Sequence, residues 1–223
     1  MQLHINQLRS KVHYPISIQI PVIDIQLKEL VIALKFKVYQ WLIKESKMYW
    51  RGSTTGDSYK NLKELNKLKR IEICKRFRES KGIDIKLSRI TQTDTNKEKT
   101  KKYLIQEKIF RKEVSENKFI NYKYYPDIPV NSLAWESIRK YLMGNLIFKS
   151  TKKRQLYYYR FLKPWKNYIP VEENFLDLEE KYSWVKSHRE EAAFIAWNGY
   201  IQSNNYVQNA PEYLISRILE RTN

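Results

Sequence analysis

Apolar residues recur at helical spacing in some stretches of the chain and alternate with polar residues in others. Residues 27–44 carry apolar side chains three or four positions apart, which predicts a helix. A strand is expected at 47–50, ending in a turn at 51–52. Residues 58–81 repeat the helical spacing and predict one basic amphipathic helix, which Gly82 is well placed to end.

The same alternation of strand and helix continues to the end of the chain. The predicted strands are 83–87, 120–125 and 146–149, and the predicted helices between and after them are 103–114, 133–143, 177–186, 190–202 and 211–221. Residues 91–102 are polar and predict a loop or the solvated start of a helix. Strands that alternate with helices predict an α/β fold: a mainly parallel, Rossmann-like sheet with helices on both faces and a helical C-terminal tail.

Charge is the most unusual feature of the composition. The 223 residues include 42 Lys and Arg against 24 Asp and Glu, a formal charge of +18. Such a surface attracts anions, among them nucleic acids, anionic membranes, lipopolysaccharide phosphates and nucleotide sugars, and the charge does not choose among them. No secretory signal and no apolar run long enough for a membrane span is visible, which predicts a soluble or peripheral protein.

Thiol and imidazole chemistry is sparse. Cys74 is the single cysteine and falls on the apolar side of a helical pattern, so a buried structural thiol is expected. The three histidines, His4, His13 and His188, are far apart and have no neighbours at ligand spacing. The sequence therefore predicts no metal site and no cofactor.

Two short segments suggest specific chemistry. Residues 50–56, Trp-Arg-Gly-Ser-Thr-Thr-Gly, combine a guanidinium, two glycines and three adjacent hydroxyls, which suits a loop that holds a diphosphate. An ordinary turn is the alternative interpretation for this segment taken alone. Residues 162–171, Leu-Lys-Pro-Trp-Lys-Asn-Tyr-Ile-Pro-Val, predict a rigid turn that enters a strand, and a structural role is expected for them.

Together, these segments resemble glycosyltransferase family 90, the KDEL-motif, capsule-associated and lipopolysaccharide-modifying glycosyltransferases that include the protein O-glucosyltransferases. The Arg-Gly-Ser segment precedes a basic helix, Tyr122-Lys123-Tyr124 follows, and the 162–171 segment leads into an acidic helix and an alanine-rich helix that ends in glycine. The resemblance implies a metal-independent GT-B-like enzyme that holds a UDP-sugar mainly in its C-terminal half. It further implies that residues 1–48 are a remnant of the acceptor-side lobe and that 49–223 form the nucleotide-sugar-binding domain.

The resemblance also suggests which residues bind the donor. Family members carry Asp-Gly-Asn followed by an arginine that helps to bind the diphosphate; in this chain Asp127 opens a segment without that glycine, and either Glu136 or Arg139 occupies the arginine position. A carboxylate would repel phosphates, which favours Arg139. The residues expected to bind the UDP-sugar are Arg51, Gly52, Ser53, Thr54, Thr55, Asp127 and Arg139. The catalytic base is not identified, because Asp24 does not match the family's site.

The predicted function is transfer of a sugar from a UDP-sugar to a hydroxyl of a glycan, a glycolipid of the lipopolysaccharide or capsule type, or a protein, with inversion of configuration. One alternative is an inactive, truncated relative that keeps nucleotide binding or serves as a scaffold. Another is a basic nucleic-acid-binding protein, suggested only by the charge. A cytoplasmic location with peripheral membrane association is expected, or the endoplasmic reticulum lumen or Golgi if a longer precursor exists.

Overall fold

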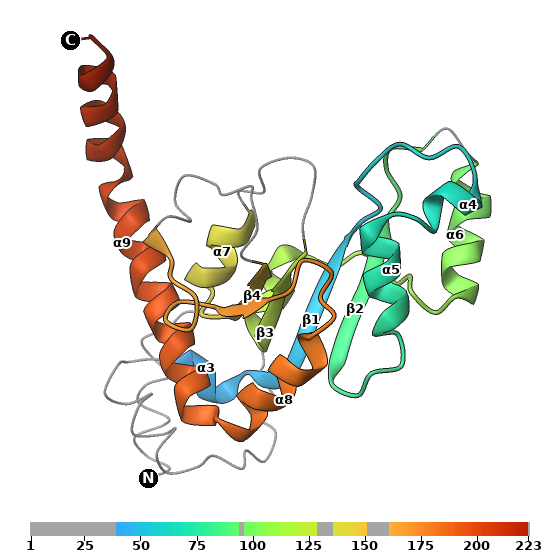
Figure 1. The fold of residues 1–223 in the computed structure, drawn as a ribbon, viewed down its shortest axis with the longest axis horizontal. Helices are drawn as coiled ribbons and strands as arrows, with labels where there is room; N and C mark the ends of the chain where they lie inside the picture. Colours follow the sequence, from blue (N-terminus) through green and yellow to red (C-terminus); the bar gives the residue numbers. More distant parts are fainter. Residues whose placement is uncertain (1–38, 94–95, 129–135, 151–160, 223) are drawn as a thin grey trace.

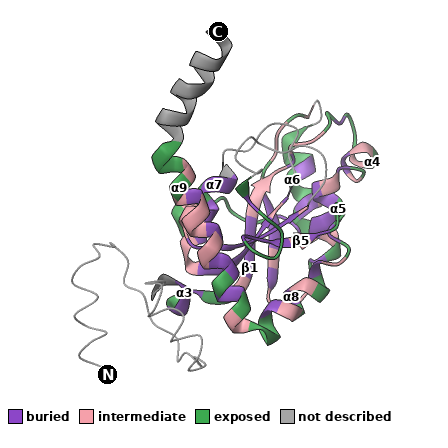
Figure 2. Ribbon diagram, turned by 60° about the vertical axis from the view of Figure 1, so that its left-hand side comes forward, coloured by how far each residue is buried: buried purple, intermediate pink, exposed green. Residues whose placement is uncertain are grey.

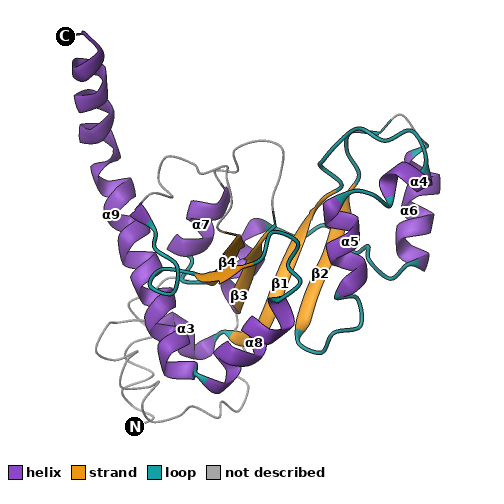
Figure 3. Cartoon of the chain, viewed as in Figure 1, coloured by secondary structure: helices purple, strands orange, loops and turns teal. Residues whose placement is uncertain are grey.

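The computed structural model describes residues 39–93, 96–128, 136–150 and 161–222 of the chain. Helices and strands alternate along it (Figures 1 and 3). In chain order the elements are α3 (Tyr39–Ile43), β1 (Glu45–Ser53), α4 (Leu62–Leu65), α5 (Lys69–Arg76), β2 (Ile83–Arg89), α6 (Lys97–Gln106), the 3-10 helix η1 (Glu116–Asn121), β3 (Tyr122–Asp127), α7 (Glu136–Leu142), β4 (Leu146–Ser150), β5 (Ile169–Val171), α8 (Leu178–Ser187) and α9 (Arg189–Thr222).

The strands form one parallel sheet in the order β2-β1-β3-β4-β5. A parallel bridge between Leu87 and Phe110 adds a short segment outside β2: Leu87 N donates to Ile109 O at 2.8 Å, and Arg111 N donates to Leu87 O at 2.8 Å. Counted in chain order with that segment as the third, the sheet order is 3-2-1-4-5-6. This is the order of doubly wound nucleotide-binding sheets.

Helices cover both faces of the sheet, and the core lies between them and the strands (Figure 2). On one face, Tyr124 meets Trp41 of α3 and Tyr182 of α8 edge to face, and α5 packs on β2. On the other face, Phe119 of η1 meets Tyr125 edge to face, and Lys140 of α7 lies over both rings. The predicted fold class is therefore confirmed, because the sheet is parallel and has helices on both faces.

Several predicted boundaries differ from the structure. The first strand continues through Gly52 to Ser53, because the Trp50 indole lies over Gly52 where a side chain would otherwise stand. The helix predicted at 58–81 is two helices, α4 and α5, interrupted after Asn66, whose N–H bonds to Leu62 O and Glu64 O. The helix predicted at 103–114 begins earlier and ends at Gln106, so the polar stretch before it is the solvated start of that helix.

The C-terminal tail is one continuous helix, α9, where two helices were predicted. β1 begins at Glu45 and Trp41 is buried, so residues 39–48 pack with the domain that the sequence places at 49–223. The remainder of the predicted 1–48 lobe, Asp24 included, lies outside the described residues.

The 162–171 segment packs against α9. Asn167 is buried; its side-chain amide donates to Asn198 O at 2.9 Å, and its side-chain oxygen accepts from Lys163 N at 2.9 Å. A Cβ on Gly199 would stand 2.6 Å from Asn167 O, so only glycine fits at this contact. The segment therefore has the structural position that the sequence suggests.

Candidate functional site

The strand order reverses between β1 and β3, which makes their carboxyl ends the topological switch point of the sheet. From β1 the chain continues to β2 on one side, and the strand on the other side, β3, arrives only after a long crossover. Loops that leave neighbouring strands in opposite directions open a crevice, and ligands of doubly wound sheets bind there. Ser53 ends β1 and Asp127 ends β3, so two of the predicted site residues lie at this switch point.

Arg70 of α5 joins the two strand ends. Its guanidinium donates to Ser53 O at 3.0 Å and to Ile128 O at 3.4 Å, and its Nη1 lies 3.5 Å from Ser53 Oγ. The same group lies 5.1 Å from the centre of the Trp50 ring, and only 7% of the residue is exposed. A forked cation at this point suits a phosphate, because guanidinium donors match phosphate oxygens in pairs.

The hydroxyl-rich loop after β1 contains both structural and accessible groups. Thr54 is fully buried; its Oγ1 donates to Thr91 O and accepts from Thr91 N, each at 2.9 Å. Ser53 and Thr55 are half-buried and their hydroxyls bond to each other. Gly56 N donates to the side chain of Gln92 at 2.9 Å, which anchors the end of the loop. The Ser53 hydroxyl therefore lies beside Arg70, whereas Thr54 fastens the loop to Thr91, two residues beyond the end of β2. The Thr55 hydroxyl also lies 3.3 Å from the Thr91 hydroxyl.

Arg51 lies on the opposite side of β1 from Trp50. It holds Asp84 of β2 in a forked pair, with both N···O distances at 2.9 Å, and also donates to the Asp84 carbonyl at 3.0 Å. Its guanidinium lies 4.2 Å from the centre of the Tyr49 ring, and its side chain is 8% exposed. Burial alone would raise the pKa of Asp84, but the hydrogen bonds and charge of Arg51, together with Lys47, lower it below its ordinary value.

Asp127 and Arg139 are held by different partners. Asp127 accepts from Ser137 Oγ at 2.8 Å, which ties the end of β3 to the start of α7. Arg139 is 64% exposed and pairs with Glu116 of η1 at 2.9 Å. Asp127 thus lies at the switch point with Ser53, while Arg139 reaches toward the segment that precedes β3. Its predicted role in diphosphate binding stays a prediction.

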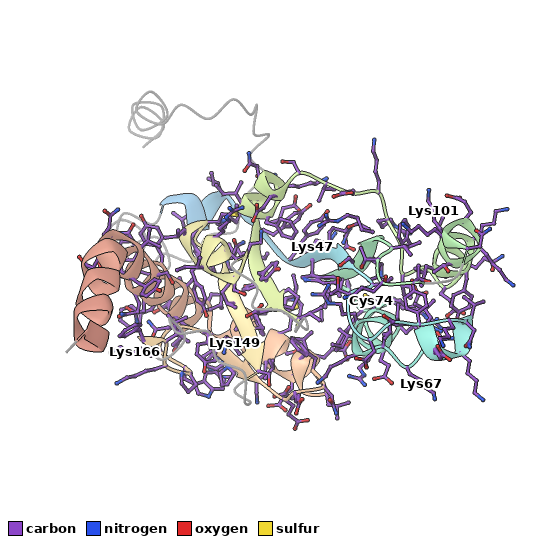
Figure 4. The ribbon with its side chains drawn as sticks, turned by 90° about the horizontal axis from the view of Figure 1, so that it is seen from above. Lys47, Lys67, Cys74, Lys101, Lys149 and Lys166 are labelled. Atoms are coloured by element: carbon purple, nitrogen blue, oxygen red, sulfur yellow. The ribbon has the colours of Figure 1, made fainter. Side chains whose placement is uncertain are left out.

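A second cation lies farther along the carboxyl edge. Lys149 is buried near the end of β4, in register with Asp127, and its Nζ lies 5.3 Å from the centre of the Tyr168 ring (Figure 4). Burial lowers the pKa of Lys149, and the charge of Asp127 opposes that shift. The cationic part of the edge therefore extends from Arg70 toward β4.

A cavity of about 540 Å³ opens beyond the ends of β4 and β5. Its lining contains three carboxylates, one lysine, an exposed indole and several polar or apolar residues: Ser150, Trp165, Pro170, Val171, Glu172, Glu173, Asn174, Asp177 and Lys181. Its rim is tied to α5, since Lys69 pairs with Glu173 at 3.1 Å and Arg76 donates to Asn174 O at 2.5 Å. The cavity thus lies beside the helix that contributes Arg70.

The structure brings together Ser53, Thr55, Asp127 and Arg70, and it places Arg51, Thr54 and Arg139 in contacts that hold the fold. Arg70 is not among the predicted site residues, because the sequence pattern described 58–81 only as a basic amphipathic helix. The signal was present: Arg70 falls three and four positions before Ile73 and Cys74, on the buried side of α5. Cys74 itself is buried, as predicted, and burial raises the pKa of its thiol to about 12.

The described residues contain neither a metal-binding cluster nor a membrane span. Nowhere in those ranges do three or more His, Cys, Asp or Glu side chains gather as a metal ion requires. None of the helices in the described part of the chain is both long enough and apolar enough to cross a bilayer.

The chain matches the model of a known protein family. The model of glycosyl transferase family 90 matches residues 16–216, which is most of the chain. The chain belongs to this family, as the sequence resemblance indicates.

Curated relatives match over a shorter stretch. Protein O-glucosyltransferase 3 from Homo sapiens is 32% identical over 90 residues, and protein O-glucosyltransferase 2 from Danio rerio is 34% identical over 88 residues. Each match covers 40% of this chain and 18% of the relative's own length.

A solved structure aligns more broadly but weakly. The catalytic domain of cholesterol-alpha-glucosyltransferase from Helicobacter pylori aligns over 70% of this chain and 98% of that domain, with a TM-score of 0.41 and 16% identity. At that TM-score the two folds are not established as the same.

Proposed function

We propose that this chain binds the UDP-sugar donor of a glycosyltransferase, with the diphosphate at the switch point between β1 and β3. The observation on which this rests is the position of Arg70, whose guanidinium lies between the carbonyls of Ser53 and Ile128 at the crevice where doubly wound sheets bind nucleotides. Family membership supports the reaction class, and the donor and acceptor are part of the proposal.

Phosphate binding at this point has a simple electrostatic basis. The guanidinium of Arg70 contacts two carbonyls and a hydroxyl at the ends of β1 and β3, and a guanidinium held there attracts the oxygens of a phosphate. When the bond between the sugar and UDP breaks, negative charge develops on the departing phosphate. A fixed guanidinium with two adjacent hydroxyls stabilises that charge without a rearrangement.

The cavity beyond β4 and β5 suits the uncharged, hydroxyl-rich parts of the donor. Glu172, Glu173 and Asp177 line it, and carboxylates accept hydrogen bonds from ribose or sugar hydroxyls but repel phosphates. We therefore place the phosphates at the cationic end of the edge and the hydroxyl groups at the acidic end. The charge along the carboxyl edge would orient the donor in one direction.

The remaining features of the reaction follow from the family and stay predictions. Direct displacement at the anomeric carbon would invert configuration, and the cations of the carboxyl edge would act in place of a metal ion. The acceptor would be a hydroxyl of a glycan, a glycolipid or a protein. No described residue is assigned as the base that removes the acceptor proton.

Isothermal titration calorimetry with UDP tests the site. Arg70→Met is expected to weaken UDP binding by about 10- to 100-fold, since a hydrogen bond to a charged group contributes about 1.5–3 kcal/mol. Arg70→Lys keeps the charge but loses the forked geometry of the guanidinium. Its UDP affinity is expected to lie between that of the native chain and that of Arg70→Met. Arg78→Met removes an exposed arginine that pairs with Glu107 and is the matched control, with UDP affinity unchanged.

The outcomes separate the site from the function. If the native chain binds no UDP, the donor proposal is wrong. If Arg70→Met folds, as shown by circular dichroism and thermal unfolding, and still binds UDP as the native chain does, the site is wrong but the donor class stands. Binding without turnover, in assays with a panel of UDP-sugars, favours the inactive relative.

A further inference from the structure

Helices α4 and α6 form a small lobe beyond the carboxyl ends of β1 and β2, at the right of Figure 1. Seven exposed lysines lie on these helices and the residues beside them: Lys60, Lys63, Lys67, Lys97, Lys99, Lys101 and Lys102. Figure 4 labels Lys67 and Lys101 at this end of the molecule. Within the described part of the chain, none of the seven side chains forms an ion pair, so this lysine lobe carries concentrated positive charge.

Several lysines of α6 stand at positions where a positive charge destabilises the helix. Lys97 and Lys99 stand in the first turn, where the helix dipole favours anions and where Glu98 is the single acidic residue, and no basic residue stands in the last turn. Lys97 and Lys101 are four residues apart and repel each other. An anionic partner would relieve both penalties.

An apolar side chain lies among these charges. Ile105 follows Lys101 by four residues on the same side of α6 and is 49% exposed. Between α4 and α6 a groove of about 400 Å³ is lined by Lys99, Lys102 and Tyr103, with Glu98 and other polar side chains. Lysines around an aliphatic residue match the interface of an anionic bilayer, which offers phosphates above acyl chains.

Nucleic acid is a poorer match for the same surface. The segments 60–69 and 96–102 contain no arginine, the residue whose fork recognises individual phosphates. Bases need exposed aromatic rings on which to stack. Tyr59 is buried, and the Tyr103 hydroxyl is engaged with Asn66 and Lys75.

We propose that the lysine lobe docks the protein on an anionic phospholipid surface. β1 and β2 run toward the lobe, so their carboxyl ends, where donor binding is proposed, lie on the same side of the molecule (Figure 1). Docking would bring the carboxyl edge close to acceptors carried by lipids. The proposal does not depend on UDP binding.

Sedimentation of the full chain with vesicles tests this proposal. The native protein is expected to bind vesicles of phosphatidylcholine mixed with phosphatidylglycerol, to bind phosphatidylcholine alone weakly, and to dissociate as salt increases. A variant with Lys97→Gln, Lys99→Gln, Lys101→Gln and Lys102→Gln is expected to bind at least about 10-fold more weakly, because each lysine near the surface contributes on the order of 1 kcal/mol. UDP affinity should stay at the native value.

The control variant has the same net charge but keeps the lobe intact. It replaces four exposed lysines elsewhere with glutamine: Lys81, Lys112, Lys118 and Lys166. Native-like vesicle binding by this control supports the proposal, and equal losses in both variants would show that only net charge matters and overturn it. Vesicle binding by the α6 variant at the native level, or native binding to RNA but not to vesicles, would also overturn it. Ile105→Ser keeps the charge and is expected to weaken binding a few-fold.

Discussion

Arg51 and Arg70 are both buried beside the end of β1, but they lie on opposite faces of the sheet and have different partners. Arg51 faces a carboxylate, Asp84, which neutralises it within the fold. Arg70 reaches the carbonyls of Ser53 and Ile128 at the switch point of the sheet. A buried cation matched by a carboxylate within one pair of strands stabilises structure, whereas a guanidinium at the switch point of a doubly wound sheet lies where such sheets bind ligands.

The difference between the two arginines shows that a recognisable segment can combine two kinds of residue. Within residues 50–56, Arg51 joins β1 to β2 and Thr54 bonds to Thr91, beyond the end of β2, while the Ser53 hydroxyl lies at the switch point beside Arg70. Arg70 lies outside the segment and supplies, in the proposed site, the cation that the sequence predicted at Arg51. Four changes test this division of roles, the largest expected effect first.

Arg51→Met should destabilise the fold by about 2–4 kcal/mol, because it leaves Asp84 partly buried with only Lys47 nearby, at 3.4 Å. Urea denaturation measures the loss. The double variant with Asp84→Asn should recover part of it, which a double-mutant cycle reports as coupling. If Arg51→Met were stable but unable to bind UDP, Arg51 would be the ligand-binding arginine and Arg70 the structural one.

Part of the stabilisation from the pair of Arg51 and Asp84 should be lost at low pH. The pKa of Asp84 is lowered in the folded protein, so its contribution is complete above the ordinary carboxyl pKa near 3.8 and is lost as the pH falls through the lower folded value. Stability measured from pH 6 to pH 2 should therefore fall more steeply for the native chain than for Asp84→Asn. Parallel curves would mean that Arg51 does not hold this carboxylate. Glu116, whose pKa is also lowered, is unchanged in both proteins and cancels in the difference.

Thr54→Val should cost about 1–3 kcal/mol, because it leaves the backbone N–H and C=O of half-buried Thr91 without this partner. Thermal unfolding is the measurement, and UDP affinity of the folded fraction should change little. A specific loss of UDP binding with native stability would place the Thr54 hydroxyl in the ligand site.

Ser53→Ala should have the smallest effect and the opposite profile. Its hydroxyl bonds to Thr55 at the crevice, so its removal should weaken UDP binding by about 3- to 10-fold with little change in stability. Calorimetry and thermal unfolding of one preparation measure the change in UDP affinity and the change in stability. Unchanged UDP affinity would remove Ser53 from the proposed site.

Local pattern predicted the fold class and most strand positions because alternation and helical spacing are properties of neighbouring residues. It did not predict that β1 passes through Gly52, where the Trp50 indole fills the space of the absent side chain. It also did not predict that α4 and α5 are separate, since Leu65, Leu68 and Ile71 keep the helical spacing across the break. The roles of Arg51 and Arg70 depend on contacts with Asp84 and Ile128, 33 and 58 residues away in the chain, which no local pattern contains.

The contact between Gly199 and Asn167 links two distant parts of the chain by steric exclusion. Because a single methyl group at position 199 would stand 2.6 Å from Asn167 O, substitutions in α9 and in the 162–171 segment are limited by the space between the two. Changes in one part should therefore require matching changes in the other. An enzyme engineer who grafts one into another protein would have to transfer both.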